Sequence, residues 1–170
     1  HAPTLSAAIP VTIQAVPSPS FEVPVPHAAG DAYNMTFFPV AIADFNGDGN
    51  ADIARVNAVV LGNGDGTFGA AIPHAVGPNA QEVATGDFNE DGHPDLAIAD
   101  DNGLEILIGN GDGSFAQAKT ITPFFVRGGP IAIADFDRDG HADLIVPDNS
   151  GTALLYCGAG DGTFQPALSI

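Results

Sequence analysis

One acidic nine-residue loop occurs three times in this chain, and the distance between its copies constrains the fold more than any other feature. The copies start at residues 44, 87 and 135, so they lie 43 and 48 residues apart. A glycine-rich turn that ends in Phe follows each loop, at residues 62–68, 109–115 and 158–164. A period of this length, with room for four short strands in each unit, is typical of the blades of a β-propeller.

Short apolar segments around the loops predict the strands. One set leads into the loops (39–45, 82–88, 130–136), a second leads out of them (52–56, 95–99, 143–146), and a third precedes the glycine turns (58–61, 104–108, 152–156). A fourth strand is expected to start at the Phe that ends each turn. These segments show little polar alternation, which favours strands covered on both faces. Phe45, Phe88 and Phe136, each the second residue of a loop, are predicted to pack between blades.

Glycine and proline interrupt almost every window of the sequence, so no long helix is expected. The sequence therefore predicts an all-β chain of β-propeller blades, each with four antiparallel strands. We expect about three full blades and a partial N-terminal blade.

The whole chain, residues 1–170, is expected to form a single domain. Residues 1–20 resemble a degenerate partial blade, because Pro17-Ser18-Pro19-Ser20 stands where a glycine turn is expected. The repeats are predicted at 21–67, 68–114 and 115–163, with 164–170 as the last strand. Closed propellers have four to eight blades, and open sheet edges favour association. Either the chain is a piece of a longer propeller or its copies associate, and we favour the first interpretation.

The chemistry of the acidic loops predicts a metal site in each. Oxygen-bearing side chains stand at positions 1, 3, 5 and 9, and glycine stands at position 6. Ca²⁺ takes six to eight oxygen ligands, several of them charged, and glycine permits a sharp bend. The alternative is a set of Asx turns without metal. Metal is favoured because these carboxylates would repel one another in an empty turn. The loops are not EF-hands, since Arg55, Ile98 and Val146 stand where the glutamate at position 12 would be required.

The loops and the glycine turns together resemble the FG-GAP/VCBS repeat family over about residues 21–170. Its members are calcium-binding β-propeller repeats of secreted and cell-surface proteins, including the heads of integrin α-subunits. The resemblance implies three Ca²⁺ sites, with the residue at position 7 contributing its backbone carbonyl. The implied ligands are Asp44, Asn46, Asp48, Asn50 and Asp52; Asp87, Asn89, Asp91, His93 and Asp95; and Asp135, Asp137, Asp139, His141 and Asp143.

The chain departs from the integrin pattern. The Phe-Gly pair survives only at Phe68-Gly69, and no clear Gly-Ala-Pro follows it. The sequence is therefore closer to the VCBS style, and cell adhesion is an expectation drawn from the family as a whole.

Composition narrows the range of partners. Four basic residues against 21 acidic ones give a net charge of −17, which argues against nucleic acid and anionic membranes. No apolar run reaches the length needed to span a bilayer, so membrane insertion is not expected. Cys157 is the only cysteine, so an internal disulfide is excluded, and we expect it to be an apolar strand residue.

These observations predict a non-catalytic, calcium-binding module of a secreted or cell-surface protein. It would act as a binding or structural scaffold for a protein or glycan ligand that the sequence does not identify. No nucleophile elbow, catalytic triad or zinc motif argues for an enzyme. The alternatives are a carbohydrate-binding, lectin-like module and an accessory domain of a secreted enzyme. The absence of Trp weakens the lectin alternative, because aromatic faces are the usual platform for sugars.

Overall fold

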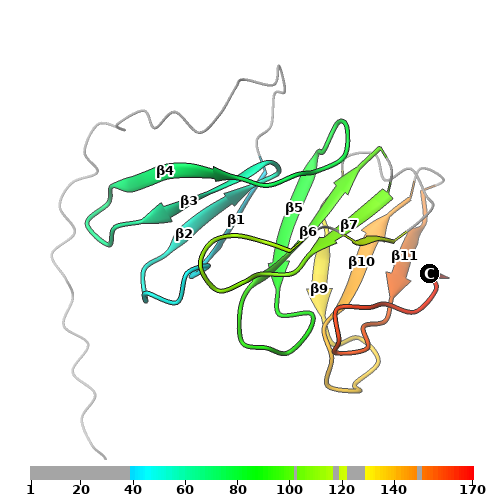
Figure 1. Ribbon diagram of the computed structural model, residues 1–170. Helices are drawn as coiled ribbons and strands as arrows, with labels where there is room; N and C mark the ends of the chain where they lie inside the picture. The colour runs from blue at the N-terminus through cyan, green and yellow to red at the C-terminus, as the bar shows by residue number, and fades with distance from the viewer. Residues whose placement is uncertain (1–38, 102, 117–118, 122–128, 149–150) are drawn as a thin grey trace, which may run out of the picture.

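The computed structural model describes residues 39–101, 103–116, 119–121, 129–148 and 151–170. Within these residues the chain is all-β, and its twelve strands form three separate four-stranded sheets (Figure 1). The predicted partial blade at residues 1–20 and the start of the first repeat lie outside the described residues. None of the described residues belongs to a helix that could cross a membrane.

Each sheet is an antiparallel meander in which the strands pair in chain order. The first sheet contains β1 (Val40–Ala43), β2 (Asp52–Arg55), β3 (Ala58–Gly62) and β4 (Phe68–Pro73). The second contains β5 (Glu82–Gly86), β6 (Asp95–Asp100), β7 (Gly103–Leu107) and β8 (Lys119–Ile121). The third contains β9 (Ala132–Ala134), β10 (Asp143–Pro147), β11 (Ala153–Tyr156) and β12 (Leu168–Ser169). The predicted blades of four antiparallel strands are thus confirmed.

The sheets and the sequence repeats differ in phase by one strand. The repeat bounds 21–67 and 68–114 assign β4 to the second repeat, whereas hydrogen bonds join β4 to β3. In the second and third blades, Phe115 and Phe164 make only isolated bridges to Gly109 and Gly158. The fourth strands of those blades begin several residues after the Phe at which they were expected to start.

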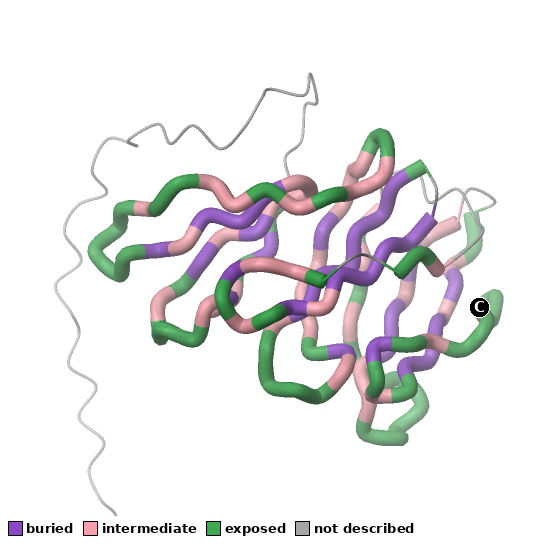
Figure 2. The backbone as a smooth tube through the Cα atoms, in the orientation of Figure 1, coloured by how far each residue is buried: buried purple, intermediate pink, exposed green. Residues whose placement is uncertain are grey.

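The three blades stack face to face, with an apolar layer between neighbours (Figure 2). The innermost strand of the middle blade, β5, lies beside β1 on one side and β9 on the other. Every residue of β6 and β7 is buried, because the middle blade is covered on both faces. The apolar, non-alternating character of these segments predicted this arrangement.

The same two contacts connect each blade to the next. Gly113 donates its backbone N–H to the Phe45 carbonyl at 2.9 Å, and Gly162 donates to the Phe88 carbonyl at 2.8 Å. Phe45 meets Phe115 edge to face, and Phe88 meets Phe164 in the same way. Phe45 and Phe88 are therefore each only 2% exposed, as predicted. Phe136 does not follow the prediction and is 42% exposed, because it lies on the outer side of the third blade.

Candidate metal centre

The three acidic loops connect the first and second strands of each blade and share one backbone conformation. Position 6 is a glycine with positive φ in each, with values of 85°, 84° and 97° at Gly49, Gly92 and Gly140. Position 4 is also left-handed, at Gly47, Glu90 and Arg138, with φ of 72°, 59° and 67°. Only the first copy has glycine at position 4, so the sequence pattern did not reveal this second bend.

Side-chain oxygens at positions 1, 3 and 5 point back into each loop and accept its backbone N–H groups. In the first loop, the Asp44 carboxylate accepts from Asp48 at 3.1 Å and from Gly49 at 2.8 Å. Asn46 Oδ1 also accepts from Asp48. The second loop repeats these bonds. In the third, the Asp135 carboxylate accepts from Arg138 and Gly140 instead.

Other hydrogen bonds within the loops lower the pKa of two of the exposed carboxylates. A bond from the Asn50 amide, with a further one from the Asn46 side chain, lowers the pKa of Asp48. A bond from the Asn89 side chain lowers the pKa of Asp91. Ionised carboxylates are the ligands that Ca²⁺ prefers.

Position 9 has a different environment from the other predicted ligands. Asp52, Asp95 and Asp143 are fully buried. Both carboxylate oxygens of Asp95 accept backbone N–H groups, from Phe88 at 2.7 Å and from Gly109 at 2.8 Å. Asp52 and Asp143 make the equivalent bonds to residues 45 and 62 and to residues 136 and 158. The position 9 carboxylate thus joins each acidic loop to the glycine turn of its own blade.

In the third loop, the carboxylates converge as a metal site requires. One oxygen from each of Asp135, Asp137 and Asp139 lies within 4.8 Å of the others. Oxygens on opposite sides of a Ca²⁺ ion, each about 2.4 Å from it, lie about 4.8 Å apart. Asp137 also lies within this distance of Asp143, so position 3 connects the carboxylates of positions 1 and 5 with that of position 9. The residues of the third loop therefore fit a hard divalent cation. The first two loops differ at position 3, where an Asn side-chain oxygen replaces the Asp137 carboxylate.

The side chains at position 7 pack against the glycine turn. A Cβ added at Gly64 would collide with Asn50, one at Gly111 with His93, and one at Gly160 with His141. His141 Nδ1 also lies 2.5 Å from Glu90 Oε1 of the preceding blade. This hydrogen bond raises the pKa of the His141 imidazole. Each position 7 residue donates its backbone N–H to the position 5 carboxylate of its own loop.

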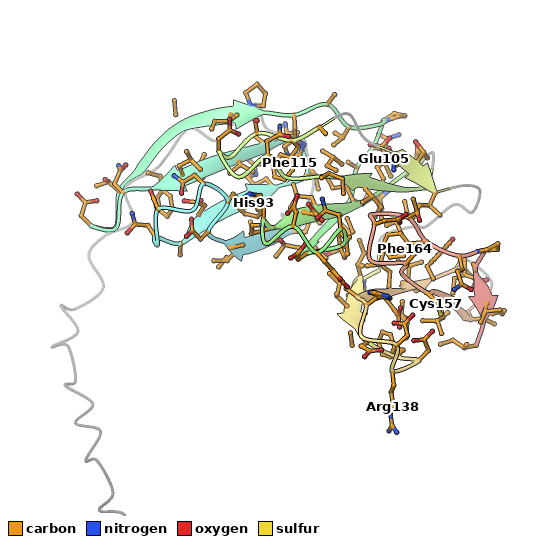
Figure 3. All side chains as sticks on the ribbon, turned by 60° about the horizontal axis from the view of Figure 1, so that its bottom comes forward. His93, Glu105, Phe115, Arg138, Cys157 and Phe164 are labelled. Atoms are coloured by element: carbon orange, nitrogen blue, oxygen red, sulfur yellow. The ribbon has the colours of Figure 1, made fainter. Side chains whose placement is uncertain are left out.

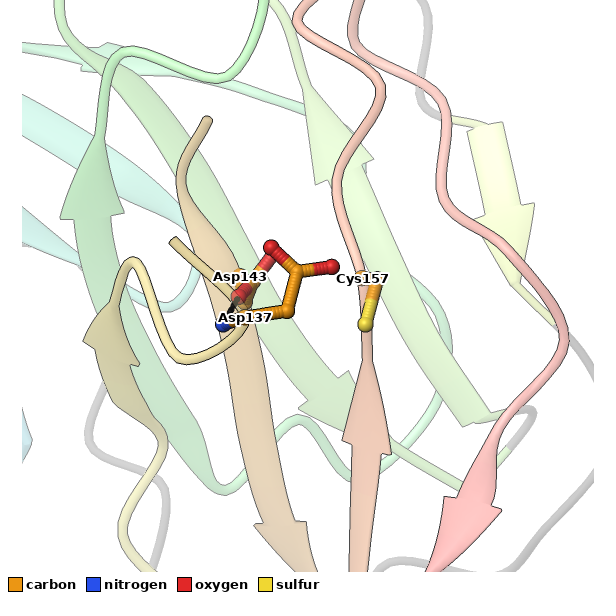
Figure 4. Close-up of side chains that lie close together, drawn as sticks. All are labelled: Asp137, Asp143 and Cys157. Carbon is orange, nitrogen blue, oxygen red and sulfur yellow. Dashed lines mark hydrogen bonds between the residues drawn. The ribbon is translucent and has the colours of Figure 1, made fainter. Parts of the chain in front are cut away.

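Cys157 lies beside the third loop, which the sequence did not predict. Its Sγ is within 4.8 Å of oxygens of Asp137 and Asp143 (Figure 4). In the first two blades, Leu61 and Ile108 occupy the equivalent position, directly before Gly62 and Gly109. Aligning the repeats therefore places Cys157 at the end of its strand but does not reveal its contact with the acidic loop. Burial, followed by a hydrogen bond with Asp137, raises the pKa of the thiol. A protonated thiol is a poor ligand for Ca²⁺, so Cys157 borders the carboxylate cluster rather than completing it.

Comparisons with known proteins agree with this architecture. A model of the FG-GAP-like repeat matches residues 54–98 and 87–146, which together span more than half of the chain. None of the curated proteins matches the chain.

One similar solved structure is that of an Agrocybe aegerita lectin that specifically recognises non-reducing terminal N-acetylglucosamine. It is 27% identical to this chain with a TM-score of 0.60, and the match covers 78% of this chain but only 37% of the lectin chain. This likeness agrees with the all-β blades described above. The chain belongs to the family of FG-GAP-like repeats.

Proposed function

We propose that this chain is a calcium-stabilised propeller module of a secreted or cell-surface protein, without catalytic activity of its own. It would act as a scaffold that binds a protein or glycan, alone or beside an enzyme domain. The convergence of Asp135, Asp137 and Asp139, with Asp143 behind them, is the observation that carries the calcium proposal. The hydrogen bond from the position 6 amide to the position 1 carboxylate, which all three loops share, extends the proposal to three sites.

Calcium would be held by the oxygens at positions 1, 3, 5 and 9 and by the position 7 carbonyl. Bound Ca²⁺ would supply positive charge in the three loops, where eleven of the 21 acidic residues gather. Hydrogen bonds connect the metal site to the contact between blades. The position 9 carboxylate binds the glycine turn of its own blade, and that turn contacts the preceding blade. Metal binding and blade stacking should therefore be thermodynamically coupled.

Thermal unfolding with and without a calcium chelator tests this proposal. Free Ca²⁺ at about 100 times the dissociation constant would add about 2.7 kcal/mol per site, or roughly 5 to 10 °C in Tm. The expected result is a lower Tm in chelator that returns when Ca²⁺ is restored, while Mg²⁺ restores much less. An unchanged Tm, with no Ca²⁺ binding in calorimetry, would contradict the proposal.

Calcium stoichiometry tests the ligands. Asp48→Ala removes the position 5 carboxylate of the first loop, which is exposed and which the blade core does not use. Three Ca²⁺ per chain should become two. Asp65→Ala, in a glycine turn, is the matched control and should still bind three. Equal stoichiometry in the two variants would show that the ligands are misassigned.

Carbohydrate binding is a second candidate, which the likeness to the Agrocybe aegerita lectin favours. This chain corresponds to just over a third of the lectin chain, so the likeness supports a shared scaffold more directly than a shared ligand. A glycan array with the calcium-loaded chain would test this candidate, and the absence of any saturable signal would remove it.

A further inference from the structure

A groove of about 600 Å³ lies between the first two blades, apart from the carboxylate cluster of the third loop. The connection from β4 to β5 (residues 73–77) forms one wall, and β7, Thr120 and the segment 114–116 form the rest. Figure 3 shows Glu105 and Phe115 on one side of the molecule, away from the third loop that Arg138 marks. The volume is in the usual range for sites that bind small ligands.

Glu105 is the unusual residue of this groove. The strand pairing shows which residues are equivalent in the three blades. Val60, Leu107 and Tyr156 are equivalent, because each pairs with the residue that follows the position 9 aspartate of its blade. The residues two positions earlier are therefore also equivalent, and they are Ala58, Glu105 and Leu154. Since two of the three blades have an apolar residue at this position, the blade fold does not require an acid there. Glu105 is only 7% exposed; it accepts a hydrogen bond from the Gly77 N–H at 3.2 Å and shares a side-chain hydrogen bond with Asp100. Its carboxyl group retains further capacity for hydrogen bonds.

Two rings provide an apolar surface in the groove. His74 and Phe115 meet edge to face, with ring centroids 5.4 Å apart. Burial lowers the pKa of the His74 imidazole, although the nearby Arg55 carbonyl opposes this shift, so the ring is neutral at physiological pH. No hydrogen bond of normal geometry reaches its two buried nitrogens among the described residues. The lining therefore combines apolar rings and Leu107 with the Glu105 carboxyl group and the Thr120 hydroxyl.

This chemistry favours a neutral, hydroxylated ligand. The net charge of −17 disfavours anions. A purely apolar ligand would make no use of the Glu105 carboxyl group, which has capacity for hydrogen bonds beyond those with Gly77 and Asp100. A sugar ring has an apolar C–H face for aromatic side chains and hydroxyl groups for a carboxyl group.

We propose that the groove between the first two blades binds a single neutral sugar residue, which packs on Phe115 and His74 and hydrogen-bonds to Glu105. The proposal rests on the second candidate function and adds its site. It also predicts one such site in the described blades, since Ala58 and Leu154 replace the acid in the other two.

Calorimetric titration of the calcium-loaded chain with N-acetylglucosamine, glucose and galactose tests the proposal. At least one sugar should bind saturably, and Glu105→Leu, which introduces the residue of the third blade, should weaken binding about tenfold or more. Glu82→Gln is the matched control, because Glu82 is a half-buried acid of the same blade outside the groove, and it should bind like wild type. Both variants should keep their calcium-dependent Tm, which shows that they fold.

Two outcomes would overturn the proposal and differ in meaning. Binding that Glu105→Leu leaves unchanged would place the sugar elsewhere, so the site would be wrong while the carbohydrate function survives. No binding of any of the three sugars by the folded, calcium-loaded chain would remove the site. The calcium-dependent Tm is independent of both results, so the calcium proposal fails or stands separately.

Discussion

At the residue scale, the aspartate at position 9 of each acidic loop contributes both to the fold of the blade and to the predicted metal site. Asp95 is buried and accepts two backbone N–H groups, one from its own loop and one from the start of the glycine turn. Asp91, at position 5, is exposed and bonds only within its loop. The resemblance assigns both residues to the same ligand set, yet the structure gives only Asp95 a role in the blade core.

Alanine substitutions should separate these two roles. Asp95→Ala leaves two buried N–H groups unpaired, at about 1–3 kcal/mol each. It should lower the free energy of unfolding by about 2–6 kcal/mol even in chelator, as measured by urea denaturation. Asp91→Ala should cost stability mainly when Ca²⁺ is present. Equal losses for the two variants in chelator would contradict this division.

At the element scale, the strands follow from local sequence, but one strand contains a residue that its pattern does not explain. All of β7 is buried, and Glu105 is the only acidic side chain in it. Burial, followed by the charge of Asp100, raises the pKa of the Glu105 carboxyl group above 4.5. Between 4.5 and the folded-state pKa, the folded chain holds a proton that the unfolded chain has released. Stability therefore falls as pH rises through this interval.

Glu105→Gln should remove this pH dependence. Below pH 4.5 the wild type is protonated in both states, so the two proteins should differ little in stability. At pH 7 the variant should be the more stable, because it has no buried carboxyl group to ionise. Urea denaturation of both proteins across this range measures the difference, in which the common effects of the acidic loops cancel. A difference that does not vary with pH would contradict the expectation.

At the scale of the whole molecule, one contact pattern connects the blades and stops at the third. Phe45 and Phe88 are covered by the next blade, whereas Phe136 is 42% exposed. Leu168 and Ile170, also in the last blade, are 58% and 61% exposed. An exposed apolar face of this kind marks an interaction surface. We expect further blades to cover it, supplied either by a longer chain or by a second copy.

Light scattering of the 170-residue chain should therefore detect self-association that increases with concentration, above the 17.2 kDa of one chain. Phe136→Ser should shift the population toward the monomer, because it removes the apolar ring to which the next blade would bind. Arg138→Ser, an exposed change in the same loop, is the control and should associate like wild type. A monomer at all concentrations would show that the exposed face is tolerated in water.

The sequence alone determined the all-β class, the first three strands of each described blade and the number of described blades. The reason is that these depend on local properties: apolar runs of strand length, turns with positive φ, and a fixed period. It also identified the family, which the repeat matches confirm. The three calcium sites stay a prediction, since the sequence specifies ligand types while bound metal must be measured.

Only the tertiary structure decided which residues meet across long distances in the chain. Asp95 bonds to an amide 14 residues away, and His141 contacts Glu90 across 51 residues. Cys157 borders the third loop, and Glu105 lines a groove between blades. Phe136 is exposed although it matches Phe45 and Phe88 in sequence. The repeats specify equivalent backbones, but burial and charge at each position depend on which neighbouring blade covers it.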